Sequence, residues 1–172
     1  ILEAGRAVVV GVNKWDAVPV EARDQVKRDL ERKLGFMAFA QQHFMSAREG
    51  RGVPALLKSV NLAFAAAMSK LPTPRLTRTL QLAVDRQQPP RAGLVRPKLR
   101  YAHQGGRNPP VIVIHGAQAE RTPEDYRRFL VNCYREAFKL KGTPVRVDFR
   151  SEDNPFAGRR DKLTPRQRRT RE

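Results

Sequence analysis

The chain has 172 residues, of which 34 are Lys or Arg and 17 are Asp or Glu, so its formal net charge is +17 at pH 7. Its single cysteine excludes an internal disulfide framework, and its three scattered histidines lack the spacing of a metal site. No stretch is long enough to span a membrane and no signal-peptide pattern opens the sequence, so we expect a cytoplasmic monomer without a membrane partner.

The first 72 residues alternate between strand and helix patterns. Residues 7–12 are a continuous apolar run, typical of a strand buried on both faces, and residues 39–45 predict a second strand. Residues 20–34 and 53–69 carry apolar side chains at helical spacing, and the second of these helices has a broad stripe for packing on a sheet. The order predicts a βαβα unit with parallel strands, which is the α/β part of the fold.

The tetrapeptide Asn13-Lys14-Trp15-Asp16 follows the first predicted strand. The Asp16 carboxylate can accept two hydrogen bonds from the N1–H and N2–H₂ edge of guanine, whereas adenine would present an acceptor to it. The stem of Lys14 can lie along the base plane, and the Asn13 amide can connect neighbouring loops. Because such a tetrapeptide also occurs as a plain strand-end turn, the assignment depends on a second motif.

Ser46-Ala47 is that second motif, and it follows the second predicted strand. In GTP-binding domains a Ser-Ala pair at this place supplies a backbone N–H to guanine O6. Ligands of open α/β sheets bind at the carboxyl ends of the strands, where both motifs lie. The sequence therefore predicts a guanine site that consists of Asn13, Lys14, Asp16, Ser46 and Ala47.

Prolines at positions 72 and 74 mark a boundary, after which the pattern changes. The sequence then predicts a helix to about residue 88, strands at 98–103 and 111–115, a helix that starts near residue 122, and a strand at 145–149. This order describes a small α+β domain with a three-stranded sheet covered by helices. We divide the chain into residues 1–71, residues 72–155 and a basic tail at 156–172 that we expect to be disordered.

Local signals within this second half predict its details. Thr73 and Thr122 are expected to cap the helices that follow them, and Gly142 to end the second helix in the left-handed conformation. Period-two alternation places Leu99 and Tyr101 on one face of a strand, with His103 as a candidate for the same face. Other rings are expected to be structural rather than base-stacking or catalytic: Tyr126, Tyr134, Phe138, His103 and His115.

Positive charge is concentrated in residues 73–172, which carry 23 basic and 10 acidic residues, a net +13. Such a surface favours phosphate-rich partners, because binding releases condensed counterions. We therefore expect this half to bind nucleic acid, rather than to carry charge only for solubility. The arginine-rich tail is expected to carry much of this binding.

Two segments resemble a known family. Residues 7–52 resemble the end of a translation-factor-related GTPase domain. Residues 98–149 are similar to the C-terminal KH-like domain of the Der family, also called EngA, bacterial GTPases with two consecutive GTPase domains. The matching motifs of the second half are Lys98-Leu99-Arg100-Tyr101-Ala102-His103, Asn108-Pro109-Pro110, Tyr126-Arg127-Arg128-Phe129-Leu130-x-Asn132 and Gly142-Thr143-Pro144-Val145-Arg146-Val147.

The resemblance implies a longer parent protein that binds and hydrolyses GTP with Mg²⁺ and acts in assembly of the large ribosomal subunit. A start at Ile1 without an initiator methionine also leads us to expect a piece of a longer chain. The five guanine-site residues would belong to the parent's second P-loop GTPase domain. Because the sequence contains no Gly-x-x-x-x-Gly-Lys-[Ser/Thr] loop and no Asp-x-x-Gly, we expect neither catalytic nor metal-binding residues here, and no GTP hydrolysis by this chain alone.

The role of the KH-like half stays open between two possibilities. RNA-binding KH domains clamp nucleotides with a Gly-x-x-Gly loop, which this sequence lacks. The domain would then dock on the parent's first GTPase domain, or contact ribosomal RNA through Arg and Lys. The main alternative for the whole chain is a non-catalytic RNA- or ribosome-binding module with a vestigial half GTPase domain. A third possibility is an unrelated basic adaptor protein in which Asn-Lys-x-Asp occurs by chance. It would not explain why Ser46-Ala47 follows in the expected order.

Overall fold

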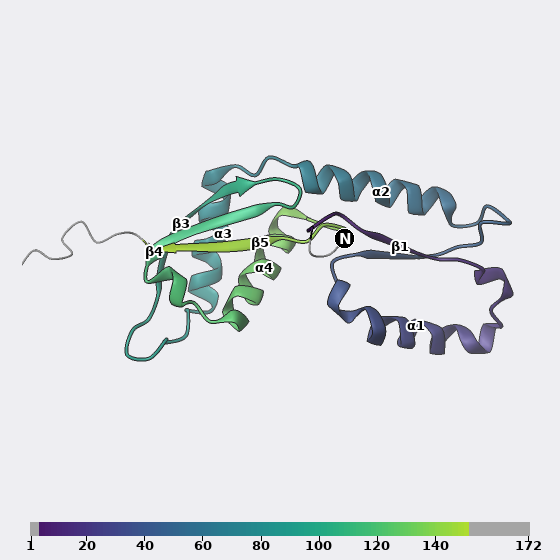
Figure 1. Ribbon diagram of the computed structural model, residues 1–172, viewed down its shortest axis with the longest axis horizontal. Coiled ribbons are helices and arrows are strands. Elements are labelled where there is room, and N and C mark those ends of the chain that lie inside the picture. Colours follow the sequence, from purple (N-terminus) through teal and green to yellow (C-terminus); the bar gives the residue numbers. More distant parts are fainter. Residues whose placement is uncertain (1–3, 152–172) are drawn as a thin grey trace, which may run out of the picture.

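The computed structural model describes residues 4–151, and the predicted tail at 156–172 lies outside them (Figure 1). Its strands are β1 (Val9–Val12), β2 (Gln41–Phe44), β3 (Lys98–Gly106), β4 (Val111–Ala117) and β5 (Arg146–Ser151). Its α-helices are α1 (Val20–Leu34), α2 (Val53–Met68), α3 (Thr73–Arg86) and α4 (Glu124–Phe138), and three short 3-10 helices are η1 (Trp15–Ala17), η2 (Gly35–Met37) and η3 (Ala119–Arg121). None of the helices in residues 4–151 is long and apolar enough to cross a membrane.

These elements form two sheets, one in each half of the chain. β1 and β2 pair in parallel, with Val9 opposite Gln41 and Val12 opposite Phe44. The second sheet has the order β3-β4-β5, in which β3 and β4 are antiparallel and β4 and β5 are parallel. Both the predicted βαβα unit and the predicted three-stranded sheet are confirmed.

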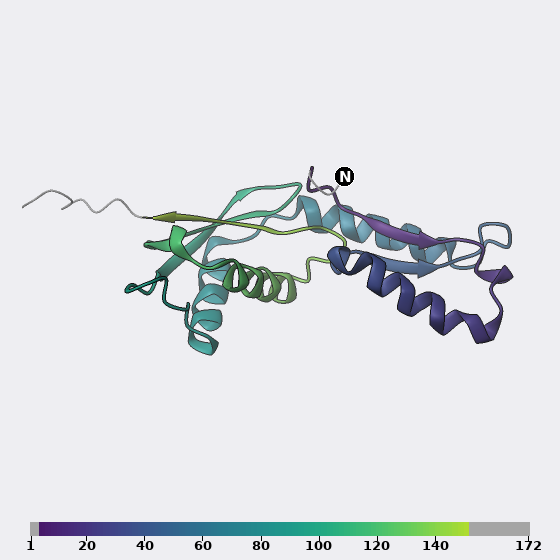
Figure 2. The same ribbon diagram turned by 60° about the horizontal axis from the view of Figure 1, so that its bottom comes forward.

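In the first half, α1 and α2 lie on either side of the two-stranded sheet (Figures 1 and 2). Helix α2 buries Ser59, Ala63 and Ala67, whereas other members of its apolar stripe, including Leu57 and Phe64, are about 60% exposed. Our prediction that the whole stripe packs on a sheet is therefore wrong. A sheet of two strands is too narrow to cover a stripe that extends around much of the helix.

In the second half, α3 and α4 pack on the same face of the sheet, which Figure 2 shows from the side. Leu76 and Leu80 of α3 and Ile112 and Ile114 of β4 belong to one hydrophobic core, and all four side chains are fully buried. The hydroxyl of Thr77 donates to the carbonyl of β3 residue 102 and accepts from the N–H of the same residue, at 3.1 and 3.2 Å. The predicted core rings of α4 are confirmed by the burial of Tyr126, Tyr134 and, in part, Phe138.

The helix ends differ from our predictions. The residues that precede α3 and α4 are Pro72 and Pro123, and neither helix start has a side-chain cap. Thr122 instead donates its hydroxyl to the carbonyl of Ala119 at 2.6 Å, which closes η3. A proline before the first turn fixes φ of the chain as it enters the helix, and it has no N–H to donate. The predicted threonine caps are therefore wrong.

A β-bulge in β3 changes the face to which its side chains belong. Leu99 is opposite Gly116 and Tyr101 is opposite His115, so Arg100 is an extra residue in β3. One extra residue reverses the alternation, and Leu99 consequently packs on the core while Tyr101 is 41% exposed on the other face. The prediction that Leu99 and Tyr101 share a face is wrong for this reason.

The two halves are joined by backbone hydrogen bonds at the amino ends of β1 and β2. The N–H of Val8 donates to the carbonyl of Gly142 at 2.7 Å, and the N–H of Gly142 donates to the carbonyl of Phe39 at 2.9 Å. The N–H of Asn108 donates to the carbonyl of Ala67 at 3.0 Å, in the last turn of α2. The predicted boundary after residue 71 stays a prediction, and contacts cross it at several points.

The left-handed conformation at Gly142, with φ of +73°, serves this junction rather than the end of α4. Helix α4 ends at Phe138, and the next residue, Lys139, is itself left-handed with φ of 53°. A Cβ atom added to Gly142 would lie 2.4 Å from the Cβ of Ala63 in α2. Gly142 is therefore required by close packing between the halves, a role that our prediction of a helix-ending glycine missed.

Candidate guanine-binding site

Parallel pairing places the two predicted motifs next to each other. They follow β1 and β2 directly, and the last residues of these strands, Val12 and Phe44, are opposite each other. The pairing continues into the loops, because the N–H of Met45 donates to the Val12 carbonyl at 2.9 Å and the N–H of Trp15 donates to the Met45 carbonyl at 3.0 Å. Both motifs therefore begin at one edge of the sheet, where backbone hydrogen bonds continue into the loops.

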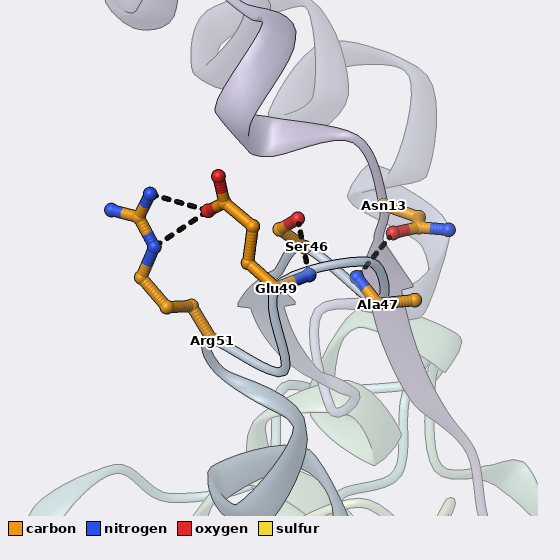
Figure 3. Close-up of polar contacts among 5 residues, drawn as sticks. All are labelled: Asn13, Ser46, Ala47, Glu49 and Arg51. Carbon is orange, nitrogen blue, oxygen red and sulfur yellow. Dashed lines mark hydrogen bonds and ion pairs between the residues drawn. The ribbon is translucent and has the colours of Figure 1, made fainter.

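Asn13 connects the two motif loops through its side chain (Figure 3). Its Oδ1 atom accepts a hydrogen bond from the N–H of Lys14 at 2.8 Å and another from the N–H of Ala47 at 3.0 Å. The second bond joins loops that are 34 residues apart in sequence, which is the role that we expect of this amide. The Ala47 N–H that we expect to meet guanine O6 is thus donated to Asn13, and a bound base would have to share it or displace the amide oxygen.

Lys14 turns the chain sharply before η1. Its φ of 62° and ψ of 30° place it in the left-handed region, which non-glycine residues rarely adopt. Backbone strain of this kind is concentrated at functional sites. Asp16 follows this turn near Ser46. A hydrogen bond from the Ser46 side chain lowers the pKa of the Asp16 carboxyl more than any other group does, and Arg48 and Arg51 lower it further. Asp16 is therefore an ionised acceptor at neutral pH.

Ser46 is 3% exposed and fixes the second motif loop from within. Its N–H donates to the carbonyl of Arg51 at 2.9 Å, and its hydroxyl accepts from the N–H of Glu49 at 3.3 Å. Beside it, the guanidinium of Arg51 donates two hydrogen bonds to one carboxylate oxygen of Glu49 (Figure 3). The loop is thus closed by both its backbone and an ion pair.

Aromatic and basic side chains that our prediction missed complete the site. The rings of Trp15 and Phe44 lie 4.3 Å apart at an angle of 41°, and the guanidinium of Arg23 lies 5.5 Å from the Trp15 ring centre. Trp15 occupies the variable position of the tetrapeptide, so the motif gives no signal for it. Arg23 belongs to α1, and its approach to the site depends on how that helix packs.

A hollow of about 140 Å³ opens at this edge. It is lined by Trp15, Asp16, Arg23, Phe44, Met45, Ser46, Glu49 and Arg51. Two of the five predicted residues, Asp16 and Ser46, are among them, whereas Asn13, Lys14 and Ala47 are not. Sites for whole small molecules have volumes of about 300 Å³ or more, so this hollow has room for part of a nucleotide only. Within residues 4–151 no group of three or more His, Cys, Asp or Glu side chains is arranged to hold a metal.

Comparison with known proteins agrees with this architecture. Residues 70–150 match the family model described as the KH-domain-like C-terminal domain of EngA bacterial GTPase enzymes. The chain is 63% identical over 161 residues to the GTPase Der of Cupriavidus pinatubonensis, which covers 94% of this chain and 36% of that relative. It is 60% identical over 161 residues to the GTPase Der of Ralstonia pickettii, with the same coverage, and 56% identical over 164 residues to that of Nitrosomonas europaea, with 95% and 35% covered.

The fold and the family match together define a class: the βαβα unit of a P-loop GTPase domain, followed by a small KH-like α+β domain. The matched relatives share the name GTPase Der, and their identity extends over both halves of the chain. The chain belongs to the Der family, also called EngA. It spans about a third of the length of the curated relatives that it matches.

Proposed function

We propose that this chain supplies the guanine-recognition loops of a Der-type GTPase, together with a KH-like domain that contacts RNA during assembly of the large ribosomal subunit in the cytoplasm. The observation that carries the first part is the hydrogen bond between Asn13 Oδ1 and the Ala47 N–H, which holds the two motifs together at adjacent strand ends. The relatives support it, because they are named as GTPases.

Base recognition would depend on the Asp16 carboxylate. It accepts hydrogen bonds from the N1–H and N2–H₂ groups of guanine, and Ser46 favours its charged form by lowering its pKa. The stem of Lys14 would lie along the base plane, and the backbone of the Ser46–Ala47 loop would meet O6. The phosphates and Mg²⁺ would be bound by residues outside this chain, whose sequence holds no phosphate loop. This chain would then select the base without performing the hydrolysis.

The second part of the proposal concerns the basic half. A net charge of +13 over residues 73–172 supports contact with ribosomal RNA. The KH-like domain would also dock on the first GTPase domain of the parent. A non-catalytic RNA- or ribosome-binding module is the alternative, and it differs in one measurable respect: GTP would not change its affinity for RNA.

The test is Asp16→Asn in a full-length Der protein that carries this sequence behind its phosphate loops. The amide can donate to the extra oxygen of xanthine, so preference should move from GTP toward XTP. Each lost charge-assisted bond should cost GTP about 1.5–3 kcal/mol. Asp24→Asn is the matched control, because Asp24 is an exposed carboxylate of α1 that pairs with Lys27. Unchanged affinity of Asp16→Asn for GTP would show that another group reads the base.

A further inference from the structure

One face of the β3-β4-β5 sheet carries no helix among residues 4–151. Helices α3 and α4 cover the opposite face (Figure 2). The side chains of residues 102, 112, 114, 147 and 149 point toward these helices and are buried. Their neighbours along each strand consequently point to the outer face, and these neighbours form an unusual surface.

Three rings form a row on this outer face. Tyr101 and His115 are cross-strand partners whose rings are stacked, with centres 4.6 Å apart and planes within 4°. His103 stacks on His115 as well, with centres 5.1 Å apart and an angle of 25°. His115 thus lies in the middle of the row, and Tyr101, which is 41% exposed, is an end of it. The bulge at Arg100 creates this arrangement, because it brings Tyr101 to the outer face.

Basic residues border the row on the adjacent strand. In β5 the outward positions are Arg146, Asp148 and Arg150, all of which are exposed, and Arg150 is the cross-strand partner of His115. Tyr101, His115 and Arg150 therefore lie side by side across the three strands. Rings with arginines beside them are the combination that binds single-stranded nucleic acid, since bases stack on the rings and phosphates pair with the cations.

The same surface is poorly suited to a protein partner. Protein interfaces have a core of buried apolar and aromatic side chains with few charges. Among the large hydrophobic side chains that are exposed in residues 4–151, Tyr101 alone belongs to this sheet, whereas five of them belong to α2. With one exposed large hydrophobic side chain on this sheet and exposed arginines beside the ring row, the surface favours RNA over a protein partner.

We propose that the outer face of the β3-β4-β5 sheet binds single-stranded RNA, with a nucleobase stacked on Tyr101 as the next member of the ring row and the backbone phosphates beside Arg146 and Arg150. This inference rests on the RNA contact in the proposed function and gives it a location. It is distinct from a second basic surface, the groove of about 510 Å³ between α4 and β5, whose lining includes Arg127, Arg128 and Arg135.

The test measures binding of the 172-residue chain to a single-stranded RNA oligonucleotide that contains 2-aminopurine, whose fluorescence reports stacking. Tyr101→Ala should weaken binding roughly 5- to 100-fold, and Tyr101→Phe should restore it. Phe36→Ala is the matched control, because Phe36 is a 65% exposed ring in the first half of the chain and should leave binding unchanged. Thermal melts of each variant establish that the fold is retained.

Salt dependence separates stacking from charge. Tyr101→Ala should lower the affinity without changing the slope of log affinity against log salt. Arg150→Ala should reduce that slope by roughly 0.7, the value for one phosphate contact in a single strand. Arg78→Ala is its control, because Arg78 is exposed on α3, which covers the other face of the sheet. An abasic oligonucleotide should bind the wild type and Tyr101→Ala equally.

Three results would overturn the inference. If Tyr101→Ala binds like the wild type while Arg128→Ala binds more weakly, RNA occupies the groove between α4 and β5, and the RNA contact of the proposed function still holds. If the wild type binds the abasic strand as tightly as the base-bearing strand, no base stacks on the row. If the wild type binds no RNA at low salt, the RNA contact fails as well, and the remaining role of the domain is protein docking.

Discussion

The junction at Gly142 allows a quantitative test of how the two halves are held together. Replacement by alanine would place a residue with a Cβ at φ of +73°, which costs about 1–2 kcal/mol. The new Cβ would also lie 2.4 Å from the Cβ of Ala63 and 3.2 Å from its Cα. Overpacking of this kind typically costs about 1–3 kcal/mol. We expect Gly142→Ala to lower the free energy of unfolding by about 2–5 kcal/mol.

Gly93→Ala separates the two contributions. Gly93 has φ of +68°, and a Cβ added to it would meet nothing within 4 Å. This variant should lose only the conformational part, about 1–2 kcal/mol. Urea unfolding followed by far-UV circular dichroism and by fluorescence of Trp15, the single tryptophan, measures both variants and reports on the first half separately.

A second variant tests the contact itself. Ala63→Gly removes the atom that the new Cβ would meet, although glycine within α2 costs about 1 kcal/mol by itself. In the double variant Ala63→Gly/Gly142→Ala the loss should be smaller than the sum of the two single losses. The reasoning is refuted if Gly142→Ala loses no more stability than Gly93→Ala, or if the two substitutions are additive.

Three further predictions concern GTP turnover, stability at alkaline pH and the bridge made by Gln104. The 172-residue chain should show no GTP turnover above background in a phosphate-release assay, and protein-dependent turnover in a clean preparation would reveal a site outside the predicted motifs. Burial raises the pKa of Tyr126 to about 12 and that of Tyr134 further, so the unfolded chain releases these protons at lower pH than the folded chain. Stability should therefore fall as pH rises from about 10 to 12. If Tyr126→Phe loses stability as steeply over this range, Tyr126 does not contribute to the fall. The Gln104 side chain accepts a hydrogen bond from the Leu71 N–H and donates one to the Ser69 carbonyl, both at 2.9 Å. Gln104→Ala should therefore lower the urea midpoint by the equivalent of about 1–3 kcal/mol. An unchanged midpoint would show that this bridge contributes nothing to stability.

The order of elements could be predicted from sequence because each element has its own local pattern. The apolar run before Asn13 and the helical spacing of 20–34 depend only on neighbouring residues, and α1 has the predicted bounds Val20–Leu34. The motif loops could also be placed from sequence, because each follows a strand and parallel strands bring their carboxyl ends to one edge. The five predicted site residues do lie in two adjacent loops, although they do not all line one hollow.

What could not be predicted depends on contacts between distant segments. Nothing in the residues around Arg100 distinguishes a bulge from a regular strand, and this single extra residue decides whether Tyr101 is buried. The role of Gly142 depends on Ala63, which is 79 positions earlier in the sequence and in the other half of the chain. The threonine caps failed because the prolines beside them already set the approach to each helix.

The joint between the halves has a consequence for exchanging domains between related proteins. It is formed by main-chain atoms of Val8, Phe39, Ala67, Asn108 and Gly142. Peptide groups are the same in every residue except proline, so the side chains at most of these positions can differ between species without removing a donor or an acceptor. A chimera that takes its KH-like domain from another member of the family would need a glycine equivalent to Gly142 and loops of matching length. The loops proposed to read the base lie at the opposite end of β1, so such a graft should leave their geometry unchanged.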